Sequence, residues 1–191
     1  FAHQLKLESQ CQVKVIDMDT TSVKACHELG VEATQGDALN PKVTGDEGVA
    51  CFNLILHHLV GKSESQTIDM QTKTLAVWRP HIKYIFVNEY IYESAIGNVS
   101  GWLIFQITKS PILSWFGRLV SIFIPSLKAN TFGVGVRFRS NAEWRQVFSH
   151  AGYIVKGFVE GRKEHVSLPR RMLLIKSIRR DSYLLEPAPN H

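Results

Sequence analysis

The sequence predicts an α/β fold: a doubly wound, mostly parallel sheet with an antiparallel last strand and a helical, aromatic-rich insertion. Three observations support this prediction. Short β-branched runs alternate with amphipathic helical segments in the first half of the chain. The run at residues 82–87 is almost wholly apolar, as is typical of a strand covered on both faces. Near the C-terminus, residues 160–170 connect two further runs and are too few for a crossover helix, so a hairpin is expected.

The N-terminal half contains the first predicted elements. Residues 1–9 have apolar residues at helical spacing and are interpreted as the end of a helix, and a strand is predicted at 13–18. A threonine oxygen of residues 20–21 is expected to cap the helix that follows, and Gly30 suits the position just past its end. Asp19 is also interpreted as a cap. Two further strands are predicted at 31–34 and 52–56.

Two capping signals mark helices further along the chain. Ser63 with Gln66 is typical of one helix start, and Ser140 with Glu143 of another. The second helix has apolar residues at positions i, i+3, i+4 and i+7 and ends before Gly152. Strands are then predicted at 153–159 and 171–178. The polar, proline-containing tail 179–191 is expected to be loosely held.

An insertion rich in Trp and Phe occupies residues 90–139. A structureless loop of this length is uncommon, so the insertion is expected to contain helices. Its apolar segment 111–127 is interrupted by Arg118 and Pro125 and is too short to span a bilayer. An interfacial helix that makes peripheral membrane contact and a pocket for a hydrophobic substrate both remain open.

The length of the chain favours one domain, which is predicted at residues 1–178 and is followed by the tail. The 191 residues carry a net charge of +5, and 45% of them are hydrophobic, which is ordinary for a globular protein. The basic residues are scattered singly or in pairs, which favours a solvated face and predicts no nucleic-acid partner. The three cysteines have no Cys-x-x-Cys spacing, which indicates reduced thiols and a cytoplasmic location.

Acidic residues mark the ends of two successive predicted strands: Asp17 lies near the end of the first, and Asp37 follows the second. Ligands of open α/β sheets bind outside the carboxyl ends of the strands, where a carboxylate can accept hydrogen bonds from both hydroxyls of a ribose. His57 and His58 follow the third strand. Because adjacent side chains point in different directions and no third ligand has suitable spacing, no metal site is predicted. A general base and a buried structural histidine are both compatible with this pair.

Five motifs in order resemble the class I S-adenosylmethionine-dependent methyltransferases. They are Val-Ile-Asp-Met-Asp, Gln-Gly-Asp-Ala-Leu, Phe-Asn-Leu-Ile-Leu-His-His-Leu, Ile-Phe-Val-Asn-Glu and Arg-Ser-Asn-Ala-Glu-Trp. The likeness covers most of residues 13–178 apart from the insertion. It implies a Rossmann-like sheet whose final strand is antiparallel, and S-adenosylmethionine (SAM) as cofactor.

The resemblance also implies roles for individual residues. Asp17 matches the acid that binds the ribose hydroxyls, and Met18 matches the neighbour that packs on the adenine. Asp37 matches the acid that accepts a hydrogen bond from the adenine amine, and the backbone of Ala38 would contact the ring. His57 and His58 fall beside the methionine part of the cofactor and are the candidate catalytic residues.

One departure from the family concerns the segment before Asp17. The family's first strand and glycine-rich turn are absent from the sequence. The ribose acid of a dinucleotide fold follows its glycine motif by roughly 20 residues, which places those glycines before Phe1. We therefore expect the sequence to be a truncated or partial chain.

The predicted function is in-line transfer of a methyl group from SAM to a small acceptor, with a hydrophobic or aromatic acceptor favoured by the insertion. Tyr90, Tyr92, Trp102 and Trp115 are the candidates to line its pocket. An NAD(P)-dependent oxidoreductase is an alternative, because Asp17 would serve its ribose equally well. The other alternative is a non-catalytic interaction protein that docks through the insertion. The oligomeric state is not predicted.

Overall fold

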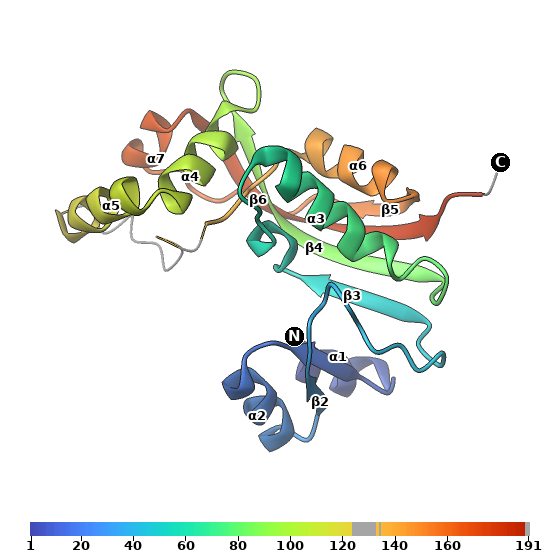
Figure 1. Cartoon of the computed structure of the whole chain (residues 1–191). Coiled ribbons are helices and arrows are strands. Elements are labelled where there is room, and N and C mark those ends of the chain that lie inside the picture. Colours follow the sequence, from blue (N-terminus) through green and yellow to red (C-terminus); the bar gives the residue numbers. More distant parts are fainter. Residues whose placement is uncertain (124–132, 134, 190–191) are drawn as a thin grey trace. The chain divides into compact units, whose positions relative to one another are not determined.

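The computed structural model describes residues 1–123, 133 and 135–189 (Figure 1). The chain divides into two compact units, Phe1–Glu47 and Gly48–His191. The expected single domain of residues 1–178 stays a prediction, and the two units are described separately below.

The first unit contains two helices and a parallel strand pair. Its elements are α1 (Ala2–Ser9), β1 (Lys14–Asp17), α2 (Thr20–Glu28) and β2 (Glu32–Gln35). The strands pair in parallel from Lys14 opposite Glu32 to Asp17 opposite Gln35. The Asp19 carboxylate caps α2, as predicted, by accepting hydrogen bonds from the backbone of Thr21 and Ser22. The expected threonine cap is wrong, because the helix begins at Thr20 itself and the acid before it supplies the oxygen.

The second unit contains a mixed sheet and most of the helices. Its elements are β3 (Val49–Asn53), the 3-10 helix η1 (Leu56–His58), α3 (Glu64–Ala76), β4 (Tyr84–Ser94), α4 (Val99–Lys109), α5 (Pro111–Phe123), α6 (Asn141–His150), β5 (Tyr153–Val159), α7 (Leu168–Met172) and β6 (Ile175–Pro187). The strand order is β3-β4-β6-β5, with β3 parallel to β4 and β6 antiparallel to both of its neighbours. The predicted antiparallel last strand is therefore confirmed.

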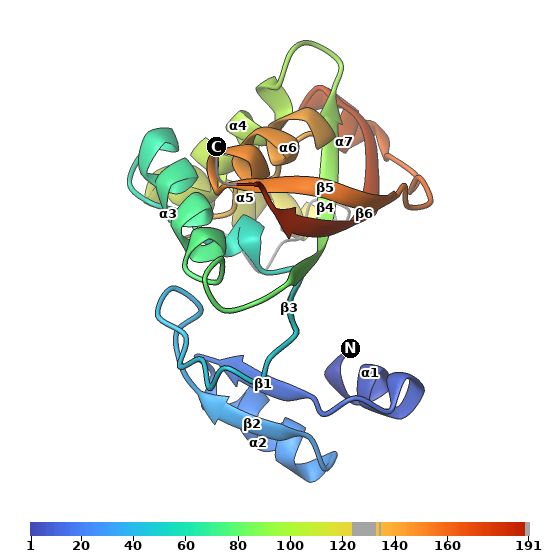
Figure 2. The same ribbon diagram turned by 90° about the vertical axis from the view of Figure 1, so that its right-hand side faces the viewer.

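The core of the second unit lies between its sheet and the helices α3 and α6 (Figure 2). Along β4 the side chains alternate between buried and half-buried, as a pleated strand requires, so that Ile85, Val87 and Ile91 share the buried face. Helix α6 contributes Trp144 and Phe148 to the same core. The predicted capping box, in which Ser140 and Glu143 cap each other's backbone, fixes the start of this helix.

Several predicted boundaries are wrong. Strand β4 continues to Ser94, so the first residues of the predicted insertion belong to the sheet. The helices expected in the insertion are present as α4 and α5. The expected loose tail is instead the second half of β6, in which Tyr183 and Leu185 are buried between β4 and β5. The described strands also form two sheets where one was expected, since the parallel pairs β1–β2 and β3–β4 are not joined by a strand ladder.

Candidate functional site

The two predicted cofactor acids lie in the first unit, at the carboxyl ends of its parallel strands. The Asp17 carboxylate accepts a hydrogen bond from the Asp19 backbone N–H at 2.8 Å. The Asp17 backbone carbonyl accepts one from the Gly36 backbone N–H at 3.0 Å. A Cβ at Gly36 would lie 2.8 Å from the Ile16 side chain, so glycine permits this close approach of the two strand ends. The Asp37 carboxylate accepts from the Leu39 backbone at 2.9 Å.

Each of these acids keeps hydrogen-bonding capacity. Within the described residues, the Oδ2 atoms of Asp17 and Asp37 accept no hydrogen bond from the protein. Met18, beside Asp17, is 70% exposed, and Ala38 is half-buried. An unengaged carboxylate oxygen beside an exposed apolar side chain can bind a hydroxyl-bearing ligand with an apolar ring.

The predicted histidine pair lies in the second unit, on η1. The His57 imidazole is 4% exposed, and its Nδ1 lies 2.6 Å from the Glu89 carboxylate of β4. The second oxygen of Glu89 accepts a hydrogen bond from the Leu56 backbone at 2.6 Å. Because a carboxylate only accepts hydrogen bonds, this contact places the proton of a neutral imidazole on Nδ1 and leaves Nε2 as its basic nitrogen.

The rings around His57 form a stack. Phe138 stacks on His57 with ring centroids 4.9 Å apart, and Tyr92 stacks on Phe138 with ring centroids 4.2 Å apart. The His58 ring lies 4.2 Å from that of His57, and the Tyr90 ring meets His57 edge-on. Partial burial and the neighbouring His57 hold the pKa of His58 below its ordinary 6.5, which favours the neutral imidazole.

The structure brings together some predicted acceptor-side residues and not others. Tyr90 and Tyr92 lie in the ring stack, and the Tyr90 hydroxyl is bonded by Arg180 at 2.5 Å. Burial raises the pKa of Tyr92 to about 12, so its hydroxyl keeps its proton at neutral pH. Trp102 on α4 and Trp115 on α5 are instead 46% and 58% exposed.

An ionic network of Glu64, Arg137 and Arg139 also holds η1 in place. The Glu64 carboxylate of α3 bonds both Arg137 and Arg139 at 2.8 Å. The Arg137 backbone donates to the His57 carbonyl at 2.9 Å. Gln71 links Arg139 to the Leu56 carbonyl, with distances of 2.7 and 2.9 Å. The backbone of the histidine pair is therefore fixed by α3 and by the segment that precedes α6.

The sequence analysis missed Glu89, Phe138 and the two arginines. The signal for Glu89 was its place at the end of the Ile-Phe-Val-Asn-Glu motif, to which no role was assigned. Two surface depressions of the second unit, beside α3 and α6, are lined by no predicted site residue. The described residues also contain no group of three or more side chains suited to a metal ion.

The chain has counterparts among solved structures. No protein family model matches it, and no curated protein sequence is significantly similar. A complex of LepI with S-adenosylhomocysteine (SAH) and a substrate analogue superposes with a TM-score of 0.56 and 12% identity, over 96% of this chain and 39% of that one. Geranyl diphosphate methyltransferase in complex with SAM superposes with a TM-score of 0.56 and 9% identity, over 97% of this chain and 72% of that one.

A SAM-dependent methyltransferase from Clostridium acetobutylicum gives a TM-score of 0.53 with 9% identity, over 94% of this chain and 76% of that one. The chain thus has the fold of the SAM-dependent methyltransferases, and it spans about two fifths of LepI. Another structure of this fold is described as a pericyclic reaction enzyme. The shared fold therefore defines the architecture of the chain, whereas its chemistry depends on the residues of the site.

Proposed function

We propose that this chain is part of a SAM-dependent methyltransferase that acts on a small acceptor. The observation that carries the proposal is the pair of acids, Asp17 and Asp37, which follow neighbouring parallel strands of a methyltransferase fold and each keep an unengaged carboxylate oxygen. In this proposal Asp17 accepts from the ribose hydroxyls and Asp37 from the adenine amine. Met18 and the Ala38 backbone contact the adenine ring.

SAM would supply an electrophilic methyl group on a sulfonium, which needs alignment with its acceptor more than acid–base help. An acceptor hydroxyl must lose its proton as its oxygen bonds the methyl carbon, while the carbon–sulfur bond breaks and its electron pair stays on sulfur. We assign that proton to His57 Nε2. The Glu89 carboxylate holds the imidazole in the required tautomer and stabilises the positive charge that it gains. His58 is the second candidate base.

The aromatic side chains of Tyr90 and Tyr92, which lie near His57, support a small hydrophobic or aromatic acceptor. Small molecules are favoured over nucleic acid because the basic residues form no concentrated stripe in the sequence. The cysteines of the described chain are unpaired, which supports a cytoplasmic location. No helix among the described residues has the length and apolar character needed to cross a membrane.

Transfer of a labelled methyl group from SAM to a panel of small phenols and alcohols tests this proposal. We expect label in at least one product, and a loss of roughly 10²–10⁴-fold in kcat for His57→Ala, the range of general acid–base catalysis. His81→Ala, which removes a histidine outside the site, is the matched control. Transfer that is equally fast in His57→Ala would remove the proposed base. Oxidation of a panel compound with NAD(P) would favour the oxidoreductase alternative.

A further inference from the structure

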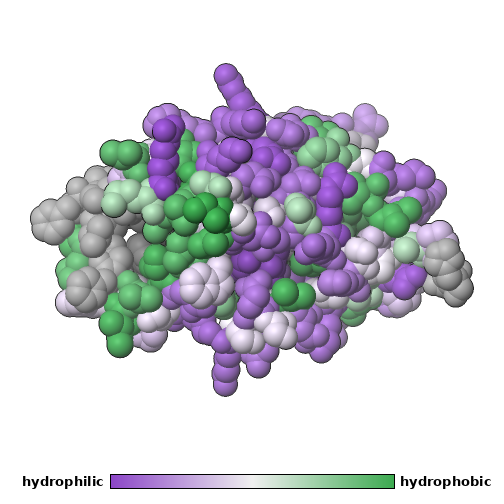
Figure 3. Space-filling model, turned by 90° about the horizontal axis from the view of Figure 1, so that it is seen from above, coloured by the Kyte–Doolittle hydropathy of each residue, from purple (hydrophilic) through white to green (hydrophobic). Residues whose placement is uncertain are grey.

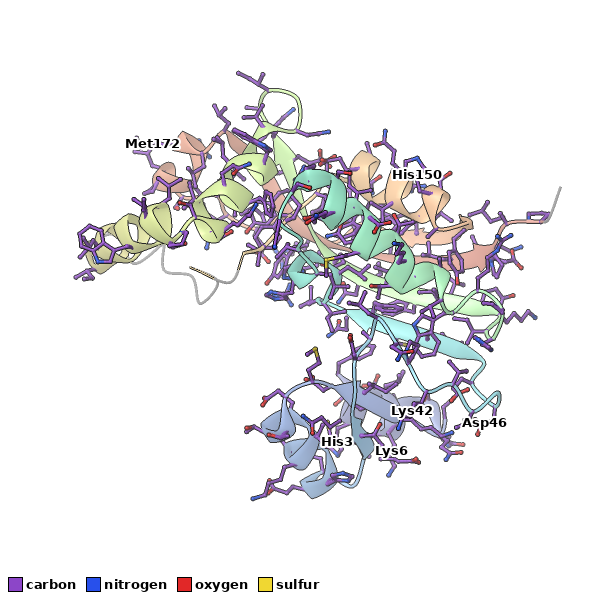
Figure 4. The ribbon with its side chains drawn as sticks, viewed as in Figure 1. His3, Lys6, Lys42, Asp46, His150 and Met172 are labelled. Carbon is purple, nitrogen blue, oxygen red and sulfur yellow. The ribbon has the colours of Figure 1, made fainter. Side chains whose placement is uncertain are left out.

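Exposed apolar side chains concentrate on three helices of the second unit. They are Trp102 of α4, Ile112, Leu113, Trp115, Leu119 and Ile122 of α5, and Leu168 and Met172 of α7. Figure 3 shows hydrophobic residues gathered at the end of the molecule that carries α5, and Figure 4 labels Met172 at the end of α7. Large exposed apolar side chains gathered on neighbouring elements of a folded protein are typical of an interaction site.

Four exposed apolar residues of α5 lie on one face of the helix. Ile112, Trp115, Leu119 and Ile122 have the spacing i, i+3, i+7 and i+10, which aligns them along a single stripe. Ile112 and Ile122 are 72% and 70% exposed. The apolar stripe of a helix in a globular protein normally faces the core, so α5 presents to its surroundings the face that other helices bury.

The charges of this region identify the surface that fits the stripe. From Ala95 to Ala142 the sequence contains no Asp or Glu, although the chain has 17 acidic residues. Its basic residues include Lys109 before α5 and Arg118 within it, and α7 adds Arg171, which is exposed. An amphipathic helix with apolar and aromatic residues on one face, basic residues and no acids is suited to the headgroup region of an anionic bilayer.

We propose that the α5 stripe, together with Leu168 and Met172 of α7, docks on the surface of an anionic lipid membrane. With 13 residues α5 is too short to span a bilayer and would lie in its interface. Attraction of the basic residues to anionic headgroups would add to the binding free energy that burial of the stripe supplies. The proposal does not depend on methyl transfer, because it concerns a different surface and is tested by binding alone.

Co-sedimentation with vesicles tests the proposal. The chain is mixed with vesicles of phosphatidylcholine, or of phosphatidylcholine with phosphatidylserine, at low and high salt. We expect sedimentation with the phosphatidylserine vesicles that weakens at high salt. Ile112→Glu/Ile122→Glu should lower the partition coefficient at least about tenfold, since two apolar side chains lose their burial.

The matched control is Leu7→Glu/Leu29→Glu, which adds the same charge at two residues of the first unit that are 64% and 54% exposed. Circular dichroism checks that both variants fold, and Leu168→Glu/Met172→Glu is a second, independent variant. Equal binding by the α5 variant and its control would overturn the proposal, as would a failure of the unaltered chain to bind phosphatidylserine vesicles. A dimer that the α5 variant abolishes, without vesicle binding, would assign the stripe to a second copy instead.

Discussion

The position of His57 depends on residues from two separate segments of the chain. Glu89 of β4 contacts its Nδ1, Phe138 stacks on its ring, and the Arg137 backbone bonds its carbonyl. A side chain with this many contacts loses little further freedom when it acts on a substrate, which is how a general base is preorganised. In the proposed mechanism the contact with Glu89 is the one that determines which nitrogen is basic.

Removing the negative charge of Glu89 tests that contact. Glu89→Gln keeps an oxygen that can accept from the Leu56 backbone, but it no longer stabilises a protonated His57. We expect kcat to fall by roughly 10²-fold or more with little change in SAH affinity. Steady-state kinetics and calorimetry measure the two quantities. Glu93→Gln, on the same strand, is the control, and equal losses of kcat in both variants would contradict the assigned role.

At the residue scale, the sequence predicted the groups that have a local pattern and missed those that depend on tertiary structure. Asp17, Asp19 and the histidine pair lie at or shortly after the ends of predicted strands, where an expectation can be formed from the chain alone. Glu89 becomes a partner of His57 only because β3 and β4 pair in parallel, with Asn53 opposite Asn88. No spacing within the sequence indicates that contact.

At the scale of elements, a reciprocal cap fixes the start of α6, and its Glu143 also bonds Arg137 of the ionic network. Ser140 Oγ accepts from the Glu143 backbone, and the Glu143 carboxylate accepts from the Ser140 backbone at 2.8 Å. Ser140→Ala removes one of these bonds. We expect the free energy of unfolding to fall by about 1 kcal/mol, within the range of 0.5–2 kcal/mol found for such caps. Denaturant unfolding measures it, and an unchanged value would show that the cap contributes nothing here.

The ion pairs of Glu64 give a pH-dependent contribution to stability. Burial opposes ionisation, but the hydrogen bond from Arg137 and the charges of both arginines prevail and hold the pKa of Glu64 below its ordinary 4.5. A folded-state pKa below the unfolded value stabilises the fold above that unfolded value, and this stabilisation is lost as the pH falls through the folded pKa. Glu64→Gln should therefore destabilise the chain at pH 7.

The difference in unfolding free energy between the unaltered chain and Glu64→Gln should shrink as the pH falls below about 4.5. Denaturant titrations at several pH values measure it, with Asp69→Asn on the exposed side of α3 as control. A difference that does not depend on pH would contradict the account of this network.

Element boundaries were the least predictable part of the fold. Capping motifs predicted the starts of α3 and α6 because the signal lies within a few residues. The lengths of β4 and β6 were underestimated because polar and charged residues interrupt their apolar pattern, at Asn88 and Glu89 in β4 and at residues 179–182 in β6. Arg179 and Asp181 are buried in β6 only because they bond each other at 2.9 Å, and Asp181 also bonds the Gly161 backbone. Such pairing is decided by tertiary contacts.

At the scale of the whole molecule, the two units differ in how much they bury. Helices α1 and α2 contain no buried residue, whereas β4 and β6 bury side chains along most of their length. Hydrogen exchange should therefore be fastest, among the described helices and strands, in α1 and α2 and slowest in β4 and β6. SAH should slow exchange at the ends of β1 and β2. Uniform protection across both units would contradict this expectation.

The most direct test of the central claim is calorimetric titration of SAH into the chain, alongside Asp17→Ala and Glu32→Ala. Glu32 is an exposed acid on β2, next to the strand that carries Asp17, and serves as the matched control. The account predicts binding that Asp17→Ala weakens by at least about tenfold, the loss expected for hydrogen bonds to a charged group, and that Glu32→Ala leaves unchanged. Absence of SAH binding, or binding of NADH in its place, would contradict the account.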